Sequence, residues 1–334
     1  MDYYIDKRKY SVVGIGNAIV DIIANVEEDF LNVCNLTKGT MRLICEEEAE
    51  SLHSRIAVKK TISGGSVANT IAGLAILGNK VAFIGKVKND VLGCAFENDL
   101  RTLGVTYITK KANGDVPSTA RCIVLTTPDA QRTMNTCLGI AGLLTPEDID
   151  EDLIKNSSIV YLEGYLWDQE VAKEAVMKAV DIAKISDCKI ALSLSDPFCV
   201  QRHRAEFYEI IREYIYFLFA NEDEISFLFE IGDIGRAIDK CKNFIPVTAI
   251  TRSEYGSIIV TKDDIIKIEA EKTTVIDSTG AGDMYAAGFI NGILKSKPLE
   301  ECGRMGSILA AEVISHYGAR PEKSLIELLA ERGL

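Results

Sequence analysis

The sequence predicts an α/β fold: a three-layer arrangement in which a mostly parallel central sheet is flanked by helices, with a small β-sheet lid added to it. Along most of the 334 residues, short apolar runs of strand length alternate with segments of helical periodicity. This alternation is typical of a parallel sheet that is covered on both faces. Residues 105–138 break the pattern with β-like runs joined by turn-rich stretches, which indicates an inserted flap.

The N-terminal segment predicts two strands that contain unexpected polar residues. Residues 12–15 have the pattern of a buried strand, and the apolar pattern resumes over residues 19–24. A dinucleotide-binding fingerprint fits this segment poorly, because Ile19 stands where its third glycine belongs. Asn17 and Asp21 interrupt the apolar stretch. Each is suited either to a turn or cap, or to holding a hydroxyl-rich ligand at a strand end.

A pair of glycines precedes the next helix-like run, which lies within residues 63–77. Gly64 and Gly65 come just before the run, and Asn69 falls in its first turn. A polar residue at a helix start is usually structural. The glycines nevertheless make this a glycine-framed helix start, and residues 81–85 predict the strand that follows.

The predicted lid takes its strands from two segments of one domain. Residues 105–109 and 119–126 are the β-like runs of the flap, and residues 21–50 would supply further strands. We therefore expect a single domain over residues 1–334. Its lid would come from about 21–50 and 105–138, and its α/β core from 1–20, 51–104 and 139–334. Appendages of this kind commonly close over a site.

From residue 146 onward the alternation is regular. A helix is predicted over residues 172–183, where apolar residues repeat on one face. Strands are predicted over residues 159–162, 190–194, 217–220, 249–251 and 257–260. Near the C-terminus a further helix has Cys302, Met305 and Leu309 on one face, and this helical pattern ends at Gly318.

The most informative stretch, residues 277–283, reads D-S-T-G-A-G-D. A strand-like run over 273–276 precedes it, and a helix-like run over 284–294 follows. Gly280 and Gly282 let the turn bring N–H groups close to a ligand, and the helix start adds its own free N–H groups and dipole, so the stretch predicts an anion site. Asp283 would repel a phosphate that is merely bound. It could instead hold or deprotonate a hydroxyl that attacks a phosphoryl group.

Composition and charge narrow the classes of partner. The chain has 37 Lys plus Arg against 49 Asp plus Glu, a formal charge of −12. This balance argues against nucleic-acid binding, which relies on clustered cations. The sequence shows no apolar run long enough to cross a bilayer. Nine cysteines are scattered without a C-x-x-C pair, which is typical of reduced thiols. We therefore expect a cytoplasmic protein without a membrane partner.

Taken together, these features resemble the ribokinase-like (PfkB-type) family of carbohydrate and nucleoside kinases, over nearly the whole chain. D-S-T-G-A-G-D is close to the family's D-T-x-G-A-G-D signature. The glycine pair with Asn69, and Asn17 with Asp21, match its N-terminal motif. N-E-D-E, residues 221–224, resembles its N-x-x-E motif. Four such matches in family order are hard to explain by chance.

The resemblance implies a ribokinase-like fold and ATP-dependent phosphorylation of a primary hydroxyl. Asp283 would be the catalytic base, with a plain helix N-cap as its alternative use. A carboxylate at a helix N-terminus is expected to be a weak base, because the dipole favours its ionised form. Gly280, Ala281 and Gly282 would donate backbone N–H groups to the transferring phosphoryl group. The substrate hydroxyls would be held by Asn17, Asp21, Gly64, Gly65 and Asn69.

For two further residues, a functional and a purely structural interpretation have about equal weight. Arg132, on the flap, would reach substrate or phosphate on closure, but most arginines are simply solvated. Tyr165 would stack on a nucleobase, and its alternative is a half-buried tyrosine at the end of the sheet.

For the ATP side, the resemblance implies Mg²⁺ held through water by Glu224, with Asn221 beside it; the alternative is a solvated acidic turn. The ATP phosphates would contact Thr251, Ser253 and Gly256. His316 and Gly318 correspond to the loop that returns near the adenine, although a lone histidine there could equally be a helix C-terminal cap. The family also often uses a monovalent cation such as K⁺ near the loop that begins at Asp277.

Within the family, several stretches resemble adenosine kinase, among them G-N-A-I-V-D-I, S-L-S-D-P-F and L-F-A-N-E-D-E. In S-L-S-D-P-F, Asp196 departs from the alanine of that pattern. Adenosine is therefore the expected acceptor, with AMP as the product. A sugar kinase of the ribokinase, fructokinase or 2-keto-3-deoxygluconate kinase type is the alternative. A non-catalytic ligand-binding protein on the same fold is the alternative of another class. The oligomeric state is left as monomer or homodimer.

Overall fold

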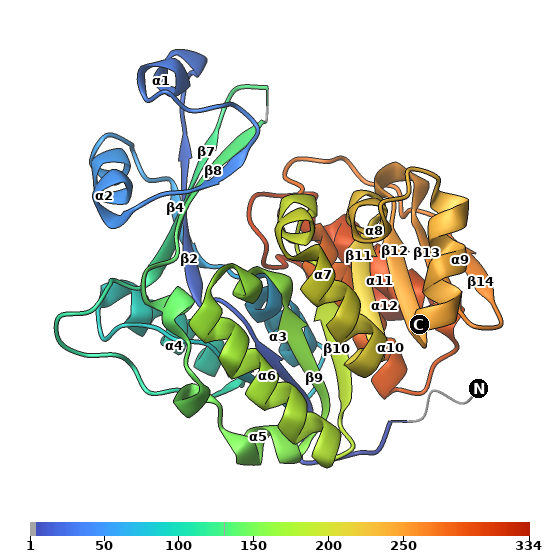
Figure 1. Ribbon diagram of the computed structural model, residues 1–334. Helices are drawn as coiled ribbons and strands as arrows, with labels where there is room; N and C mark the ends of the chain where they lie inside the picture. The colour runs from blue at the N-terminus through green and yellow to red at the C-terminus, as the bar shows by residue number, and fades with distance from the viewer. Residues whose placement is uncertain (1–4, 130) are drawn as a thin grey trace.

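The computed structural model describes residues 5–129 and 131–334 and contains two separate sheets (Figure 1). The larger sheet has nine strands in the order β14-β13-β12-β11-β10-β9-β1-β5-β6. It is parallel from β12 to β6, while β13 and β14 form an antiparallel edge. The strands are β1 Tyr10–Ile15, β5 Val81–Ile84, β6 Thr106–Tyr107, β9 Ser157–Glu163, β10 Lys189–Ser193, β11 Phe217–Asn221, β12 Val247–Thr251, β13 Ser257–Thr261 and β14 Ile265–Ile268.

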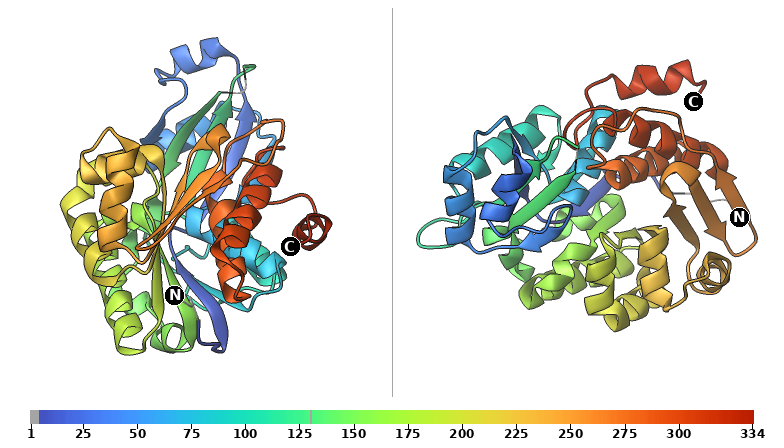
Figure 2. Two further views of the ribbon diagram at one scale, coloured as in Figure 1. Left: turned by 90° about the vertical axis from the view of Figure 1, so that its right-hand side faces the viewer. Right: turned by 90° about the horizontal axis from the view of Figure 1, so that it is seen from above.

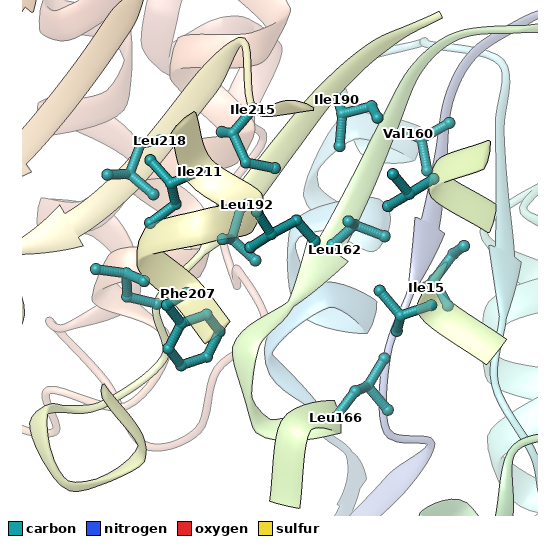
Figure 3. Close-up of a cluster of buried hydrophobic side chains, with 14 of the residues drawn as sticks. Ile15, Val160, Leu162, Leu166, Ile190, Leu192, Phe207, Ile211, Ile215 and Leu218 are labelled. Atoms are coloured by element: carbon teal, nitrogen blue, oxygen red, sulfur yellow. The ribbon is translucent and has the colours of Figure 1, made fainter. Parts of the chain in front are cut away.

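Helices cover both faces of this sheet, which gives the predicted three layers (Figure 2). The layers follow from the period of two in each strand. In β1, Val13 and Ile15 pack in one apolar cluster, whereas Val12 packs in the other. Part of the first cluster is drawn in Figure 3. Its helices, which contribute buried side chains to it, are α5 Glu151–Lys155, α6 Glu170–Ile185, α7 Pro197–Tyr214, α8 Glu222–Phe229 and α9 Ile234–Phe244. The second contains α3 Ser66–Ile76, α4 Val91–Thr102, α10 Ala281–Leu294, α11 Leu299–Val313 and α12 Leu325–Glu331.

The smaller sheet projects from the main body at the upper left of Figure 1 and forms the lid. Its strand order is β3-β8-β7-β2-β4. Two short helices, α1 Glu28–Val33 and α2 Glu46–Ser54, pack on one of its faces. The chain enters it from β1 through residues 16–18, so main sheet and lid are joined at the point where Asn17 lies. The strands are β2 Ile19–Asn25, β3 Met41–Leu43, β4 Lys60–Ser63, β7 Ala120–Thr126 and β8 Arg132–Cys137.

The predicted fold class is confirmed, and the strand assignment differs in two places. Residues 106–107 form β6, which pairs with β5 in the main sheet and so does not belong to the lid. Residues 60–63, predicted as part of the core, form β4 and pair with β2 in the lid. The first four residues of the predicted core and residue 130 of the predicted lid lie outside the described residues.

The strand predicted over residues 273–276 is wrong. Val275 is 61% exposed, and residues 273–276 form no strand and belong to neither sheet. Instead, the N–H groups of Ile276 and Asp277 donate to the carbonyl of Ile314 just beyond α11, at 2.8 and 3.3 Å. The segment that leads into D-S-T-G-A-G-D is therefore anchored by the end of α11.

Two expectations drawn from composition can be compared with the structure. All nine cysteines are free thiols, and Cys122, Cys137, Cys188, Cys199, Cys241 and Cys302 are buried. In the part of the chain that the structure describes, no helix combines the length and apolarity needed to cross a bilayer.

Candidate active site

The D-S-T-G-A-G-D loop, residues 277–283, is called the signature loop below, and its first carboxylate holds it in place. Asp277 is buried and accepts hydrogen bonds from the backbone N–H and hydroxyl of Thr279 and, at 2.9 Å, from the N–H of Gly318. Gly280 has φ 78°, and a methyl group on it would lie 2.6 Å from Cβ of Ala319. Only glycine therefore fits this position. Asp277 and Gly280 together lock the loop against residues 318–319.

The predicted anion site falls at the start of α10. The helix begins at Ala281, directly after the left-handed Gly280. The first N–H groups of a helix have no partner within it, and the dipole makes this end positive. Gly282 is exposed, with no atom within 4 Å of where its Cβ would stand. There is therefore open space beside the helix start, which fits a phosphoryl group.

Asp283 links this helix start to the second one. Its Oδ1 accepts a hydrogen bond from the hydroxyl of Ser66 at 2.6 Å, and its Oδ2 accepts one from Nδ2 of Asn69 at 2.9 Å. Both donors lie in the first turn of α3, so the two glycine-framed helix starts face each other across Asp283. Ser66 was not predicted, and its place between the glycine pair and Asn69 is the only signal for it.

The protonation of Asp283 differs from the sequence-based expectation. Burial raises the pKa of its carboxyl group to about 6, and the hydrogen bonds from Ser66 and Asn69 and the charge of Arg320 oppose this rise. The helix dipole alone predicted a weaker base. Loss of solvation is thus the larger effect here, and it makes Asp283 a stronger base than expected.

The glycine pair brings Asn17 and Asp21 into the same site. A methyl group on Gly64 would lie 2.4 Å from Oδ2 of Asp21. Gly65 has φ 89°, and a methyl group on it would lie 2.3 Å from the carbonyl oxygen of Asn17. Burial raises the pKa of Asp21 to about 7. Asn17 lies between β1 and β2, Asp21 lies in β2, and the two glycines form the turn between β4 and α3. The fold brings these segments together.

Glu163, at the end of β9, is a site residue that the sequence reasoning missed. It is 1% exposed and accepts hydrogen bonds from Nδ2 of Asn17 at 2.8 Å, from its N–H at 3.3 Å and from the N–H of Val67 at 3.1 Å. The side-chain amide of Asn17 is therefore already engaged and is set in place by Glu163. Burial raises the pKa of Glu163 to about 7. A single glutamate closing the apolar run S-S-I-V-Y-L-E was the available signal.

Arg132 extends from lid strand β8 to the signature loop. Its Nε lies 2.9 Å from Oδ1 of Asp277, one terminal nitrogen donates to Oγ of Ser278 at 2.8 Å, and the other contacts Oγ1 of Thr279. Arg132 is therefore largely shielded from solvent and lies against the loop. The side chain of Arg132 thus ties the lid to residues 277–279 of the D-S-T-G-A-G-D loop.

Tyr165 lies in the short 3-10 helix Gly164–Asp168 that follows β9. It is half-buried and packs against the first apolar cluster. Its N–H donates to Oγ of Ser195 at 3.3 Å, and its hydroxyl donates to the carbonyl of the same residue at 3.4 Å. These contacts hold the tyrosine against Ser195, which follows the end of the neighbouring strand β10.

Asn221 and Glu224 form the start of α8. Each side chain caps the backbone N–H of the other, at 2.8 and 2.9 Å, and Nδ2 of Asn221 also donates to Oε1 of Glu224 at 2.8 Å. This is a capping box, not a solvated turn. Burial raises the pKa of Glu224 to about 8.

The other predicted ATP-side residues fall into two groups. Thr251 pairs with Asn221 in the sheet, and Ser253 and Gly256 follow it in the β12–β13 turn, so these residues share one edge with Asn221. His316 lies elsewhere, with its Nε2 3.2 Å from Oε1 of Glu312 in α11. The N–H of Gly318 donates to the carboxylate of Asp277. Among the described residues no cluster of three His, Cys, Asp or Glu could hold a metal directly.

A mostly parallel sheet with a β-lid, and a carboxylate, Asp283, set between the start of α10 and the first turn of α3, are the features expected of a phosphotransferase with an alcohol group as acceptor. The chain belongs to the pfkB family of carbohydrate kinases, whose model matches residues 11–325.

Similar proteins divide between two acceptor classes. The structure of a probable sugar kinase from Rhizobium etli is 40% identical, with a TM-score of 0.93 and coverage of 98% of this chain and 99% of that one. Adenosine kinase from Sinorhizobium meliloti is 42% identical, with a TM-score of 0.92 and coverage of 98% and 100%. A 5-dehydro-2-deoxygluconokinase from Listeria monocytogenes is 27% identical over 325 residues, covering 94% of this chain and 92% of the relative.

Proposed function

We propose that this kinase transfers the γ-phosphoryl group of ATP to the 5′-hydroxyl of a nucleoside, with adenosine as the acceptor and AMP as the product. The observation that carries the reaction is the position of Asp283, between the start of α10 and the hydrogen-bond donors of α3. The likeness to the Sinorhizobium adenosine kinase supports the choice of acceptor.

In this proposal the acceptor hydroxyl lies beside Asp283, which takes its proton late in the transfer. With a pKa of about 6, the carboxyl group is mainly ionised at pH 7.5 and is better matched to proton transfer than an ordinary aspartate. The N–H groups of Gly280, Ala281 and Gly282 stabilise the transferring group, and each such donor is worth about 3 kcal/mol in a preorganised site. Alignment carries most of the rate, because the transition state is loose.

The remaining residues divide between the two substrates. Asp21, the glycine pair and Asn69 hold the sugar hydroxyls, with Asn17 set by Glu163, and Arg132 and Tyr165 complete the acceptor side. ATP–Mg²⁺ supplies the phosphoryl group and neutralises its charge. Its phosphates and its metal-bound waters would be held by Asn221, Glu224, Thr251, Ser253 and Gly256, with His316 and Gly318 nearer the adenine and Asp277 in a monovalent-cation loop.

A sugar kinase is the second candidate. The relative from Listeria monocytogenes supports it, because its name gives 5-dehydro-2-deoxygluconate as the acceptor. The polar cluster around Asp21 can hold the hydroxyls of a free sugar as well as those of a ribose. A non-catalytic binding protein has no support, since the chain belongs to a kinase family and retains Asp283.

The test is ADP release from ATP–Mg²⁺ with adenosine, inosine, ribose, fructose, 2-keto-3-deoxygluconate and 5-dehydro-2-deoxygluconate. We expect adenosine to give the highest kcat/KM. Turnover of a free sugar with none of adenosine would contradict the proposal. Asp283→Asn is the control for the chemistry: kcat should fall by about 10²- to 10⁴-fold while ATP still binds. Normal turnover by this variant would show that Asp283 is not the base.

A further inference from the structure

Arg320 is a buried cation with no assigned role. It follows Gly318 and Ala319, the residues that lock the signature loop, and its side chain is 15% exposed. Its Nε donates to the carbonyl of Ser63 at 3.1 Å. Both terminal nitrogens are buried without a hydrogen-bond partner in the described residues, and the carboxylate of Asp99 is 3.8 Å away. A guanidinium group left in this state is costly unless nearby charges compensate for it.

The anchor of Arg320 places its guanidinium group beside residues 63–66, the turn that also contacts Asp21 and Asp283. Ser63, which it contacts, is followed by Gly64, against which the carboxylate of Asp21 packs. Two residues further on, Ser66 donates to Asp283. The four residues 63–66 therefore gather one guanidinium and two carboxylates at the junction of β4 and α3.

We propose that Arg320 is the fixed counter-charge of the acceptor site, a positioning residue that keeps Asp21 and Asp283 ionised together. Two carboxylates in one desolvated site oppose each other's ionisation, and a nearby cation offsets this. Arginine suits the role because it stays charged even when buried. Arg320 would thus let Asp21 bind hydroxyls while Asp283 acts as a base.

The electrostatic surroundings agree with this role. The charge of Arg320 lowers the pKa of both carboxyl groups against the larger effect of burial, and Asp283 raises that of Asp21. The other titratable groups that interact with the pair come from several elements: Arg132 in β8, Cys122 in β7, Tyr161 and Glu163 in β9, and Asp277 in the signature loop.

The inference rests on the proposed kinase reaction and is tested by the pH profile of kcat from pH 5 to 9.5. Arg320→Gln should move the acid limb about one pH unit upward, the lower end of the shift of about 1 to 3 units that a nearby opposite charge gives a carboxyl group. With the pKa of Asp283 moved from about 6 to about 7, activity at pH 6 would fall about fivefold and recover above pH 8. Arg320→Lys keeps the charge and should leave the limb in place. Arg332→Gln, at an exposed pair with Glu271, is the matched control and should change nothing.

These outcomes distinguish an electrostatic role of Arg320 from a purely structural one. A residue that only supports the loop would lower kcat by the same factor at every pH, and this result, or an unmoved limb, would overturn the proposal. Should Arg320→Gln not fold, Arg320→Lys decides: a shifted limb in that variant also overturns it.

Failure of the proposed function is a distinct result, namely no turnover by the wild type with any acceptor. The inference is then decided by urea unfolding. If Arg320 is the counter-charge, Arg320→Gln loses more stability at pH 8.5, where both carboxyl groups are ionised, than at pH 5.5. An equal loss at both pH values overturns it.

Discussion

At the scale of single residues, the absence of a side chain at Gly64 shapes the acceptor site as much as any polar group. The carboxylate of Asp21 packs directly against Gly64, at a distance where a Cβ would overlap it. The carboxylate can therefore approach the start of α3 and face Asp283. Gly65 does the same for the backbone of Asn17.

Gly64→Ala should displace Asp21 and weaken acceptor binding. The new methyl group would lie 2.4 Å from Oδ2 of Asp21. We expect KM for the acceptor to rise at least tenfold, which corresponds to about 1.4 kcal/mol, with KM for ATP little changed. Gly232→Ala is the control, because no atom lies within 4 Å of its added Cβ. Equal kinetics for both variants would show that Asp21 does not touch the acceptor.

Local motifs made Asn17, Asp21, Gly64, Gly65 and Asn69 predictable, because each stands out against its own apolar neighbours. Glu163 and Arg320 could not be placed in the same way. Their partners lie 146 and 257 residues away in the sequence. A pattern along one strand does not reveal which strand lies beside it. The pKa of Asp283 was misjudged for a similar reason, since burial depends on the whole fold.

At the scale of elements, the lid is connected to the D-S-T-G-A-G-D loop by Arg132. Strand β8 carries Arg132 to Asp277, whose carboxylate also holds the loop through Gly318. This pair is well buried, with side chains 16% and 3% exposed. Loss of one partner of a buried pair leaves the other charge uncompensated.

Arg132→Met should loosen the lid. We expect a higher KM for the acceptor and a loss of about 3 kcal/mol in the free energy of unfolding, because Asp277 is left buried without its cation. Lys38→Met is the control on the same lid: its partners Glu28 and Asp129 are exposed, and such pairs contribute at most about 1 kcal/mol. Urea unfolding and acceptor titration measure the two effects. Similar changes in both variants would show that Arg132 does not hold the lid to the loop.

Element boundaries were predictable where periodicity decides them and not where pairing does. Strands β9 to β13 and helix α6 have clear patterns, and the structure contains all of them. The assignment of β4 to the lid, and of β6 to the main sheet, depends on neighbours that come from other segments. The run at 273–276 has the composition of a strand but pairs with none.

At the scale of the whole molecule, four carboxyl groups lie in or near the site. Glu163 and Glu224 are buried and Asp21 and Asp283 are partly buried, and loss of solvation raises the pKa of each. The values are about 7 for Asp21 and Glu163, about 8 for Glu224 and about 6 for Asp283. In the unfolded chain these groups would titrate near pH 4. The native state therefore binds more protons than the unfolded state between these values. The site keeps its carboxyl groups at a cost in stability.

Without ligand, the stability of this protein should therefore fall as the pH rises from 5 to 8. The sign follows from linkage: groups with a raised native pKa stabilise the fold below about pH 4, and this stabilisation is lost as the pH passes through the native values. Glu163 alone accounts for about 3 kcal/mol. The measurement is urea unfolding at pH 5, 6.5 and 8. Glu163→Gln, which cannot titrate, should flatten the curve. A stability that increases over this range, or an equal slope in the variant, would mean that these carboxyl groups are ionised in the native state already at pH 5.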